Sequence, residues 1–219
     1  MLSQTGKPEE SLTELRQALA IWQKLADANP GVTEFQSDLD RSHAILGRLL
    51  ARQKRFAEAF TALDASLAIS RRLAEADPKN TQYRNHLGYS HAFRGAARFR
   101  AGQPAEAAAD LRRALELWAK LPNRDIGKLA ERSRALALLA GLGGDAKSGV
   151  TKDESRTFAD QSVAALAAAV KSGWAIPGEL KEPDFDALRG RADFQKLLAE
   201  VEAKAEKPLA TAPLPREKK

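Results

Sequence analysis

The chain repeats itself, and this repetition strongly limits what it can fold into. Residues 6–25 match residues 102–121 at ten of twenty positions, and residues 35–73 align with residues 83–121 without a gap. The second alignment sets a period of 48 residues. Periods of roughly 20 to 50 residues are typical of arrays in which each unit buries its apolar face only against its neighbours. Because such arrays are usually binding surfaces, the repeat favours recognition over catalysis.

Each repeating unit has the pattern of two helices. Between residues 58 and 73, apolar side chains recur at three- and four-residue steps, which is the stripe of an amphipathic helix. Helix-forming residues dominate the chain and strand-forming residues are sparse. Prolines at positions 30, 78 and 122 each follow the end of a helix, and residues 53–55 form a tight turn within the first unit. We therefore predict helices over about 33–53 and 56–76 in one unit, and over about 81–101 and 104–121 in the next.

A spaced set of small and large residues identifies the kind of repeat. The set in the first unit is Gly47, Ala59, Leu63 and Ser66, and in the second it is Gly95, Ala107, Leu111 and Ala114. This pattern resembles the tetratricopeptide repeat, with small residues where helices approach closely and large residues where they interdigitate. The family's repeat has about 34 residues, so we interpret the longer period as helices lengthened by about a turn or more. The resemblance implies an all-α superhelix, a solenoid of antiparallel helix pairs with a short helical cap at the C-terminal end.

The sequence predicts four consecutive parts. They are tetratricopeptide-like repeats over 1–122, a degenerate final helix pair over 123–175 with helices at 124–142 and 154–171, a helical cap over 176–206 and a disordered tail over 207–219. The first repeat is expected to be truncated at its N-terminus, because residues 6–25 match a second helix. The ending contains Gly173-Trp174 and the segments 183–189 and 193–198. It resembles the C-terminal end of repeat regions attached to bacterial serine/threonine kinases, best known from planctomycetes. That resemblance implies a place at the end of a signalling kinase.

Composition narrows the possible partners and location. The chain has no cysteine, which fits a reducing compartment, and we expect it to be cytoplasmic. No stretch approaches about 18 consecutive apolar residues, so no membrane segment is expected. The net charge is +6, but basic residues alternate with acidic ones and lack interleaved aromatic residues, so we expect no nucleic-acid partner.

No catalytic or metal-binding arrangement emerges from the residues. His86 and His91 are five positions apart, which does not place them on one helix face as metal ligands. His43 and His91 occupy equivalent repeat positions, which favours a packing role. Asp184 and Asp186 are expected to cap a helix or to face solvent, because the sequence around them lacks the glycine of the kinase magnesium motif. We therefore expect no enzyme activity, no cofactor and no metal.

The inner face of the array is the expected binding surface. By family resemblance the first helices line a concave groove, whose candidate peptide-binding residues here are Arg41, Arg48, Arg52, Tyr89 and Arg100. Arginine has a planar fork that suits carboxylates, so the expected partner is a protein or acidic peptide. Three other interpretations stay open: the arginines merely keep an exposed helix soluble, the array self-associates through residues 6–25, or it is an accessory domain of an enzyme.

Overall fold

The structure is an array of helices. The computed structural model describes residues 8–121 and 126–206, and this part of the chain contains helices and no strand. In order, the helices are α1 (Pro8–Ala28), α2 (Thr33–Arg52), α3 (Phe56–Ala76), α4 (Thr81–Arg100), α5 (Pro104–Ala119), α6 (Ile126–Gly141), α7 (Lys152–Lys171), α8 (Pro177–Leu180), the 3₁₀ helix η2 (Pro183–Leu188) and α9 (Ala192–Glu206). The expected all-α class is confirmed. The tail expected over 207–219 lies outside the described residues.

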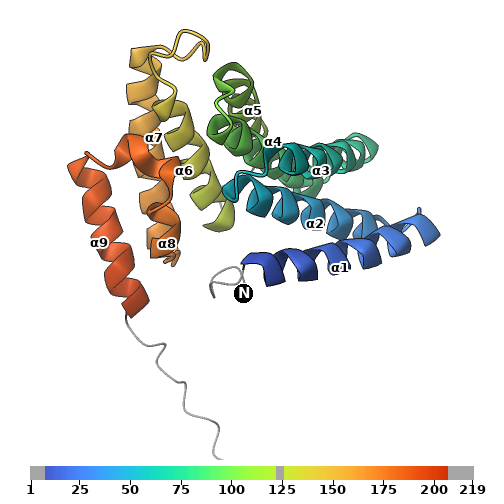
Figure 1. Cartoon of the computed structure of the whole chain (residues 1–219). Coiled ribbons are helices and arrows are strands. Elements are labelled where there is room, and N and C mark those ends of the chain that lie inside the picture. The colour runs from blue at the N-terminus through green and yellow to red at the C-terminus, as the bar shows by residue number, and fades with distance from the viewer. Residues whose placement is uncertain (1–7, 122–125, 207–219) are drawn as a thin grey trace, which may run out of the picture.

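Three helical hairpins stack side by side. They are α2 with α3, α4 with α5, and α6 with α7, and each hairpin contacts the next. Helix α1 lies against α2 at one end of the array, and α8, η2 and α9 lie at the other end (Figure 1). The helices of the first two hairpins begin and end within about two residues of the expected bounds. The array is the superhelix of helix pairs that the sequence predicts.

Two equivalent glycines show why the hairpins repeat. A Cβ atom at Gly47 in α2 would lie 2.5 Å from Leu63 Cγ in α3, and one at Gly95 in α4 would lie 2.8 Å from Leu111 Cγ in α5. Only a residue without a side chain allows so close an approach of the two helices. Residues 48 apart therefore occupy equivalent positions, as the internal alignment predicts.

Local signals start several helices. Asn80 caps α4, because its side-chain oxygen accepts hydrogen bonds from the backbone N–H groups of Gln82 and Tyr83. Thr151 and Glu154 form a reciprocal capping box at the start of α7. This cap places the first residue of α7 at Lys152, two positions before the expected start.

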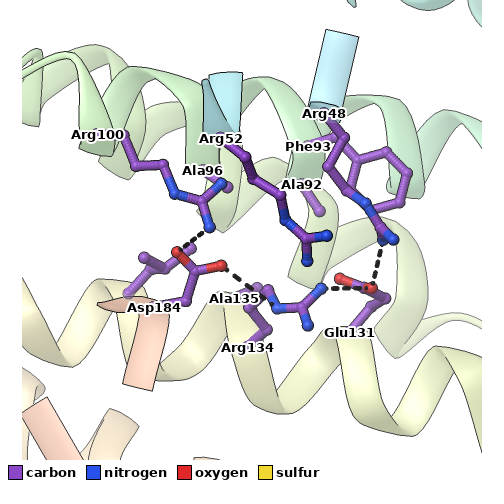
Figure 2. Close-up of a pocket in the computed structure, with 11 residues that line it drawn as sticks. Arg48, Arg52, Ala92, Phe93, Ala96, Arg100, Glu131, Arg134, Ala135 and Asp184 are labelled. Atoms are coloured by element: carbon purple, nitrogen blue, oxygen red, sulfur yellow. Dashed lines mark hydrogen bonds and ion pairs between the residues drawn. The ribbon is translucent and has the colours of Figure 1, made fainter. Parts of the chain in front are cut away.

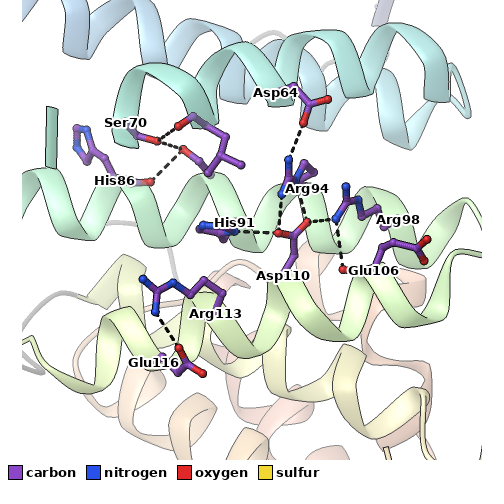
Figure 3. A network of polar contacts seen from close by, with 12 residues as sticks. Asp64, Ser70, His86, His91, Arg94, Arg98, Glu106, Asp110, Arg113 and Glu116 are labelled. Atoms are coloured by element: carbon purple, nitrogen blue, oxygen red, sulfur yellow. Dashed lines mark hydrogen bonds and ion pairs between the residues drawn. The ribbon is translucent and has the colours of Figure 1, made fainter. Parts of the chain in front are cut away.

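A buried carboxylate ties α3, α4 and α5 together. Asp110 in α5 accepts hydrogen bonds from His91, from Arg94 and from Arg98, all in α4, and Arg94 also donates to Asp64 in α3 (Figure 3). Burial by itself would raise the pKa of Asp110, but the bonds from His91 and Arg94 outweigh burial and hold that pKa below its usual value.

The repeated histidines differ in their partners. His91 is buried and hydrogen-bonds Asp110 through Nδ1, at 2.8 Å. His43 stands 48 positions earlier, where the counterpart of Asp110 is Ala62, and its buried Nδ1 has no hydrogen-bond partner among the described residues. Burial lowers the pKa of His43. The Nδ1 atoms of both histidines are buried, which agrees with a packing role.

Within residues 8–121 and 126–206, none of the helices combines the length and hydrophobicity that a membrane span needs.

Candidate functional site

The first helices of the three hairpins face the C-terminal cap across a narrow crevice. Helices α2, α4 and α6 contribute most of its lining and η2 contributes Asp184 (Figure 2). We call the surfaces of α2, α4 and α6 that line this crevice, with their continuation along α2 and α4, the inner wall. Side chains fill the crevice almost completely and leave a void of only about 10 Å³. The cap, which the sequence did not place on this wall, therefore covers part of the expected groove.

Three of the five predicted groove residues have acidic partners from other parts of the fold, and a fourth, Arg41, has Asp38 of its own helix at 3.8 Å. Arg48 lies 3.2 Å from Glu131 of α6, with its guanidinium carbon 5.1 Å from the centre of the Phe93 ring. Glu182, just before η2, contacts both Arg52 at 2.5 Å and Arg100 at 3.1 Å. Arg100 also pairs with Asp184 at 2.7 Å. These arginines are therefore ion-paired within the chain rather than free.

Arg134 of α6 is the most buried cation of the inner wall, and sequence reasoning missed it. Its guanidinium contacts Glu131 and Glu179 at 2.7 Å each, and Asp184 at 3.4 Å. Burial opposes its charge, but the surrounding carboxylates outweigh burial and raise its pKa. A signal was present, because Arg134 begins a run of alanines and leucines in which a charged side chain needs a partner.

Asp184 corrects one expectation from the sequence. It is buried and lies between Arg100 and Arg134, whereas a solvated or capping role was expected. Burial raises its pKa, and the two arginines act in the opposite direction. Asp186, its expected companion, is exposed and pairs with Arg189. The correction arises because η2 packs Phe185 and Leu188 into the core and carries Asp184 inward with them.

The other two predicted residues line an open cleft between α2 and α4. This α2–α4 cleft has a volume of about 240 Å³, and its lining consists of Asp40, Arg41, Ala44, Ile45, His86, Tyr89, Ser90 and Phe93. Its surface is almost entirely apolar. Ile45 remains 42% exposed, and the Arg41 side chain 58% exposed. Exposed apolar surface inside a concavity is typical of a binding site.

A second cavity lies beside the paired arginines. It has a volume of about 540 Å³ and is lined by Ala51, Arg52, Lys54, Phe56, Phe99, Arg100, Glu182 and Pro183. The Glu182 carboxylate that bridges Arg52 and Arg100 thus borders open space. Among the described residues, no group of three or more His, Cys, Asp or Glu is placed to hold a metal ion. The inner wall therefore combines apolar surface with neighbouring guanidinium groups, an arrangement that suits the binding of a polypeptide.

Comparison with known protein families matches part of the chain. Residues 45–78 match the family model of the tetratricopeptide repeat, which covers the C-terminal part of α2, the following turn and all of α3. Searches of curated proteins and of solved structures found no match. The match includes Gly47, Ala59, Leu63 and Ser66, which carried the resemblance in the sequence. The chain therefore contains a segment similar to a tetratricopeptide repeat, set in an array of hairpins that repeat its packing.

Proposed function

We propose that the chain is a non-catalytic module that binds a peptide or protein partner along its inner wall. The observation that carries the proposal is the open α2–α4 cleft, which lies on the first helices of an array similar to tetratricopeptide repeats. Such repeats generally mediate protein–protein interaction. An apolar side chain of the partner would enter the cleft beside Ile45. The proposal places this module in the cytoplasm, which agrees with the absence of cysteine.

We further propose that the partner segment is acidic. Arg41 stands at the open end of the wall, while Arg52 lies 11 residues further along the same helix, a distance of about 16 Å or five extended residues. An acidic peptide across the cleft could pair with Arg41 and displace Glu182 from Arg52 and Arg100. The arginines would then exchange the Glu182 carboxylate for a carboxylate of the peptide, so neither guanidinium would be left unpaired.

A peptide-library screen tests the proposal. Wild-type protein should select acidic sequences with one apolar anchor, and the selection should weaken as salt rises. Ile45→Glu and Arg41→Glu should each lower affinity by about fivefold to tenfold. Arg113→Glu is the matched control for Arg41→Glu, because Arg113 is similarly exposed but lies on α5. The proposal fails if no acidic sequences are selected, or if the α2–α4 cleft variants bind as wild type.

The Glu182 carboxylate, which bridges Arg52 and Arg100, allows a sharper test of whether these two arginines bind the peptide. Glu182→Gln should raise the affinity for acidic peptides, because Arg52 and Arg100 lose a competing negative charge. The Arg52→Glu, Arg100→Glu double variant should lose that binding, provided that circular dichroism shows an intact helical fold. If neither change alters binding, these arginines serve the cap alone.

The resemblance to repeat regions attached to kinases suggests a context for this module. We propose that it works as the C-terminal part of a signalling kinase. Sequencing the reading frame upstream of Met1 tests that context, and an upstream frame that encodes another kind of protein would contradict it.

A further inference from the structure

The cavity beside Arg52 and Arg100 has the size and the lining of a small-molecule site, and we call it the cationic cavity. It lies where the C-terminal ends of α2 and α4 meet the start of η2. Its volume of about 540 Å³ falls within the range of about 300–1,000 Å³ that is typical of ligand pockets. Most of its surface is apolar, and four charged side chains complete the lining. Pockets for small molecules usually combine these two kinds of surface.

Cations outnumber carboxylates in this lining. Arg52, Lys54 and Arg100 face one carboxylate, that of Glu182, and three positive charges against one negative charge give a net charge of +2. Arg100 also pairs with Asp184, which does not line the cationic cavity. Within the described part of the chain, Lys54 has no carboxylate partner, and the buried Nε atom of Arg52 has no hydrogen-bond partner. The cavity therefore holds positive charge that the fold does not neutralise.

Lys54 has a backbone conformation that favours glycine. It follows α2 with a φ of 61°, and its counterpart 48 positions later, after α4, is Gly102 with a φ of 72°. The two turns close with equivalent backbone hydrogen bonds of 2.9 Å. A lysine in this left-handed region costs conformational energy that glycine avoids. Backbone strain of this kind often occurs at ligand sites, and here it places a third cation on the cavity.

The net charge favours a negatively charged occupant. The segments outside the described residues do not supply one, because 1–7 contain one lysine and no acidic residue, 122–125 contain one arginine and one aspartate, and 207–219 contain four basic residues and one glutamate. A phosphate monoester has a charge of about −1.5 to −2 at pH 7 and three acceptor oxygens. That charge matches the lining, and both arginine and lysine bind phosphate.

The apolar part of the lining favours a ligand with a flat ring. Phe56 and Phe99 both border the cationic cavity, and both are only partly buried, so each leaves aromatic surface for a ligand. Nucleobases stack on aromatic side chains of this kind. A molecule that carries both a phosphate group and a nucleobase is a nucleotide, and the net charge of the lining corresponds to one phosphate group.

We propose that the cationic cavity binds a nucleoside monophosphate. Its phosphate group pairs with Lys54 and with donors of Arg52 and Arg100 that Glu182 does not use, since a guanidinium group has five N–H donors. Its base lies against Phe99 and the neighbouring Phe56. The site is separate from the α2–α4 cleft, so the proposal does not rest on peptide binding there. An acidic peptide that reaches the two arginines competes with the nucleotide.

Isothermal titration calorimetry of the full chain with AMP, GMP, CMP and UMP tests the proposal. At least one of the four should bind at low salt, and its affinity should fall as salt rises. The matching nucleoside, which lacks the phosphate, and ribose 5-phosphate, which lacks the base, should each bind at least about tenfold more weakly. The proposal is overturned if none of the four binds, or if either fragment binds as tightly as its nucleotide. Tighter binding of a phosphotyrosine peptide would also overturn it, because the ligand would then be a protein segment.

The Lys54→Gly variant separates ligand binding from folding. It removes one cation but suits the left-handed backbone, so the midpoint of thermal unfolding should stay close to that of wild type. Its affinity for the nucleotide should fall by about fivefold or more, and unchanged affinity would overturn the proposal. Lys79→Gly is the matched control, because Lys79 is also exposed but lies in the turn between α3 and α4, away from the cavity.

A variant of the α2–α4 cleft distinguishes this site from the peptide site. Ile45 lines that cleft and does not line the cationic cavity. Ile45→Glu should therefore leave nucleotide affinity unchanged while it weakens peptide binding. Loss of nucleotide binding in a folded Ile45→Glu protein would place the ligand in the α2–α4 cleft and overturn the proposal. Peptide binding that persists when no nucleotide binds would overturn this proposal alone.

Discussion

Trp118 occupies the space that Gly88 leaves by having no side chain. A Cβ atom at Gly88 would lie 2.3 Å from the indole nitrogen, and that nitrogen donates a hydrogen bond to the Asn85 carbonyl at 3.4 Å. The same two positions in the preceding unit are Asp40 and Ser70. There, hydroxyl groups and a carboxyl form a buried polar network instead. The same hairpin geometry therefore accommodates either a buried tryptophan packed on glycine or a buried polar network, provided that the residues at the two facing positions change together.

Adding a methyl group at Gly88 should destabilise the fold. We expect Gly88→Ala to lower the free energy of unfolding by about 1–2 kcal/mol, because overpacking against Trp118 exceeds the gain in helix propensity. Urea denaturation measures the change. Gly31→Ala is the control, since a Cβ there has no neighbour within 4 Å. Equal losses in the two variants would contradict this account of the Trp118 pocket.

Asp40 should make stability depend on pH. Burial raises the pKa of Asp40 to about 7, although Ser66 and Ser90 donate hydrogen bonds to it and Arg41 is close. The folded state therefore keeps a proton that the unfolded state releases above about pH 4. As the pH rises from about 4 to 7, we therefore expect the free energy of unfolding to fall progressively, by up to about 4 kcal/mol. Below about pH 4 the carboxyl is protonated in both states, so it adds no pH dependence there.

Asp40→Asn tests this expectation. The variant should match wild type near pH 4 and exceed it in stability near pH 8, as followed by thermal unfolding over that range. His86 could titrate in the same experiment, because its Nδ1 atom lies 3.7 Å from Asp40 and burial lowers its pKa. Repeating the measurement in a His86→Gln background removes that contribution. Asp27→Asn, at an exposed position on α1, is the carboxyl control. A constant difference between Asp40→Asn and wild type at all pH values would rule out the titration.

Removing the buried cation of the inner wall should be costly. Arg134→Met leaves Glu131, Glu179 and Asp184 without their shared partner, and we expect a loss of about 3–5 kcal/mol in the free energy of unfolding. Adding Asp184→Asn should recover part of the loss. Arg113→Met, which removes an exposed pair with Glu116, should cost less than about 1 kcal/mol. Denaturation midpoints that are the same for the two single variants would show that the cluster stabilises nothing.

Helix α1 should be the least protected long helix of the isolated chain. The Leu15 and Trp22 side chains of α1 are partly exposed, whereas Leu111 and Trp118 in α5 are fully buried. Fewer buried contacts lower the free energy of local opening. Hydrogen exchange with mass-spectrometric readout compares α1 with α5 directly. Equal protection in a sample shown to be monomeric would contradict the prediction.

The helices and their pairing were predictable because their causes are local or repeat along the chain. Apolar spacing defines each helix, prolines mark the junctions at Pro30, Pro78 and Pro104, and Gly47 and Gly95 mark the close approach within a hairpin. The short helices near the C-terminus were less predictable. Asp184 was expected to cap a helix or to face solvent, and only the burial of Phe185 beside it shows why it lies inside.

The sequence by itself determined the repeat, the helical class and the alignment of Arg48 and Arg52 on one side of a helix, since helical periodicity is a property of neighbouring residues. Only the tertiary structure decided what those arginines bind. Their partners Glu131 and Glu182 lie 83 and 130 positions later along the chain, and the stacking of hairpins brings them together. Ion pairs leave no periodic trace in a sequence, so the cap's place on the inner wall could not be foreseen.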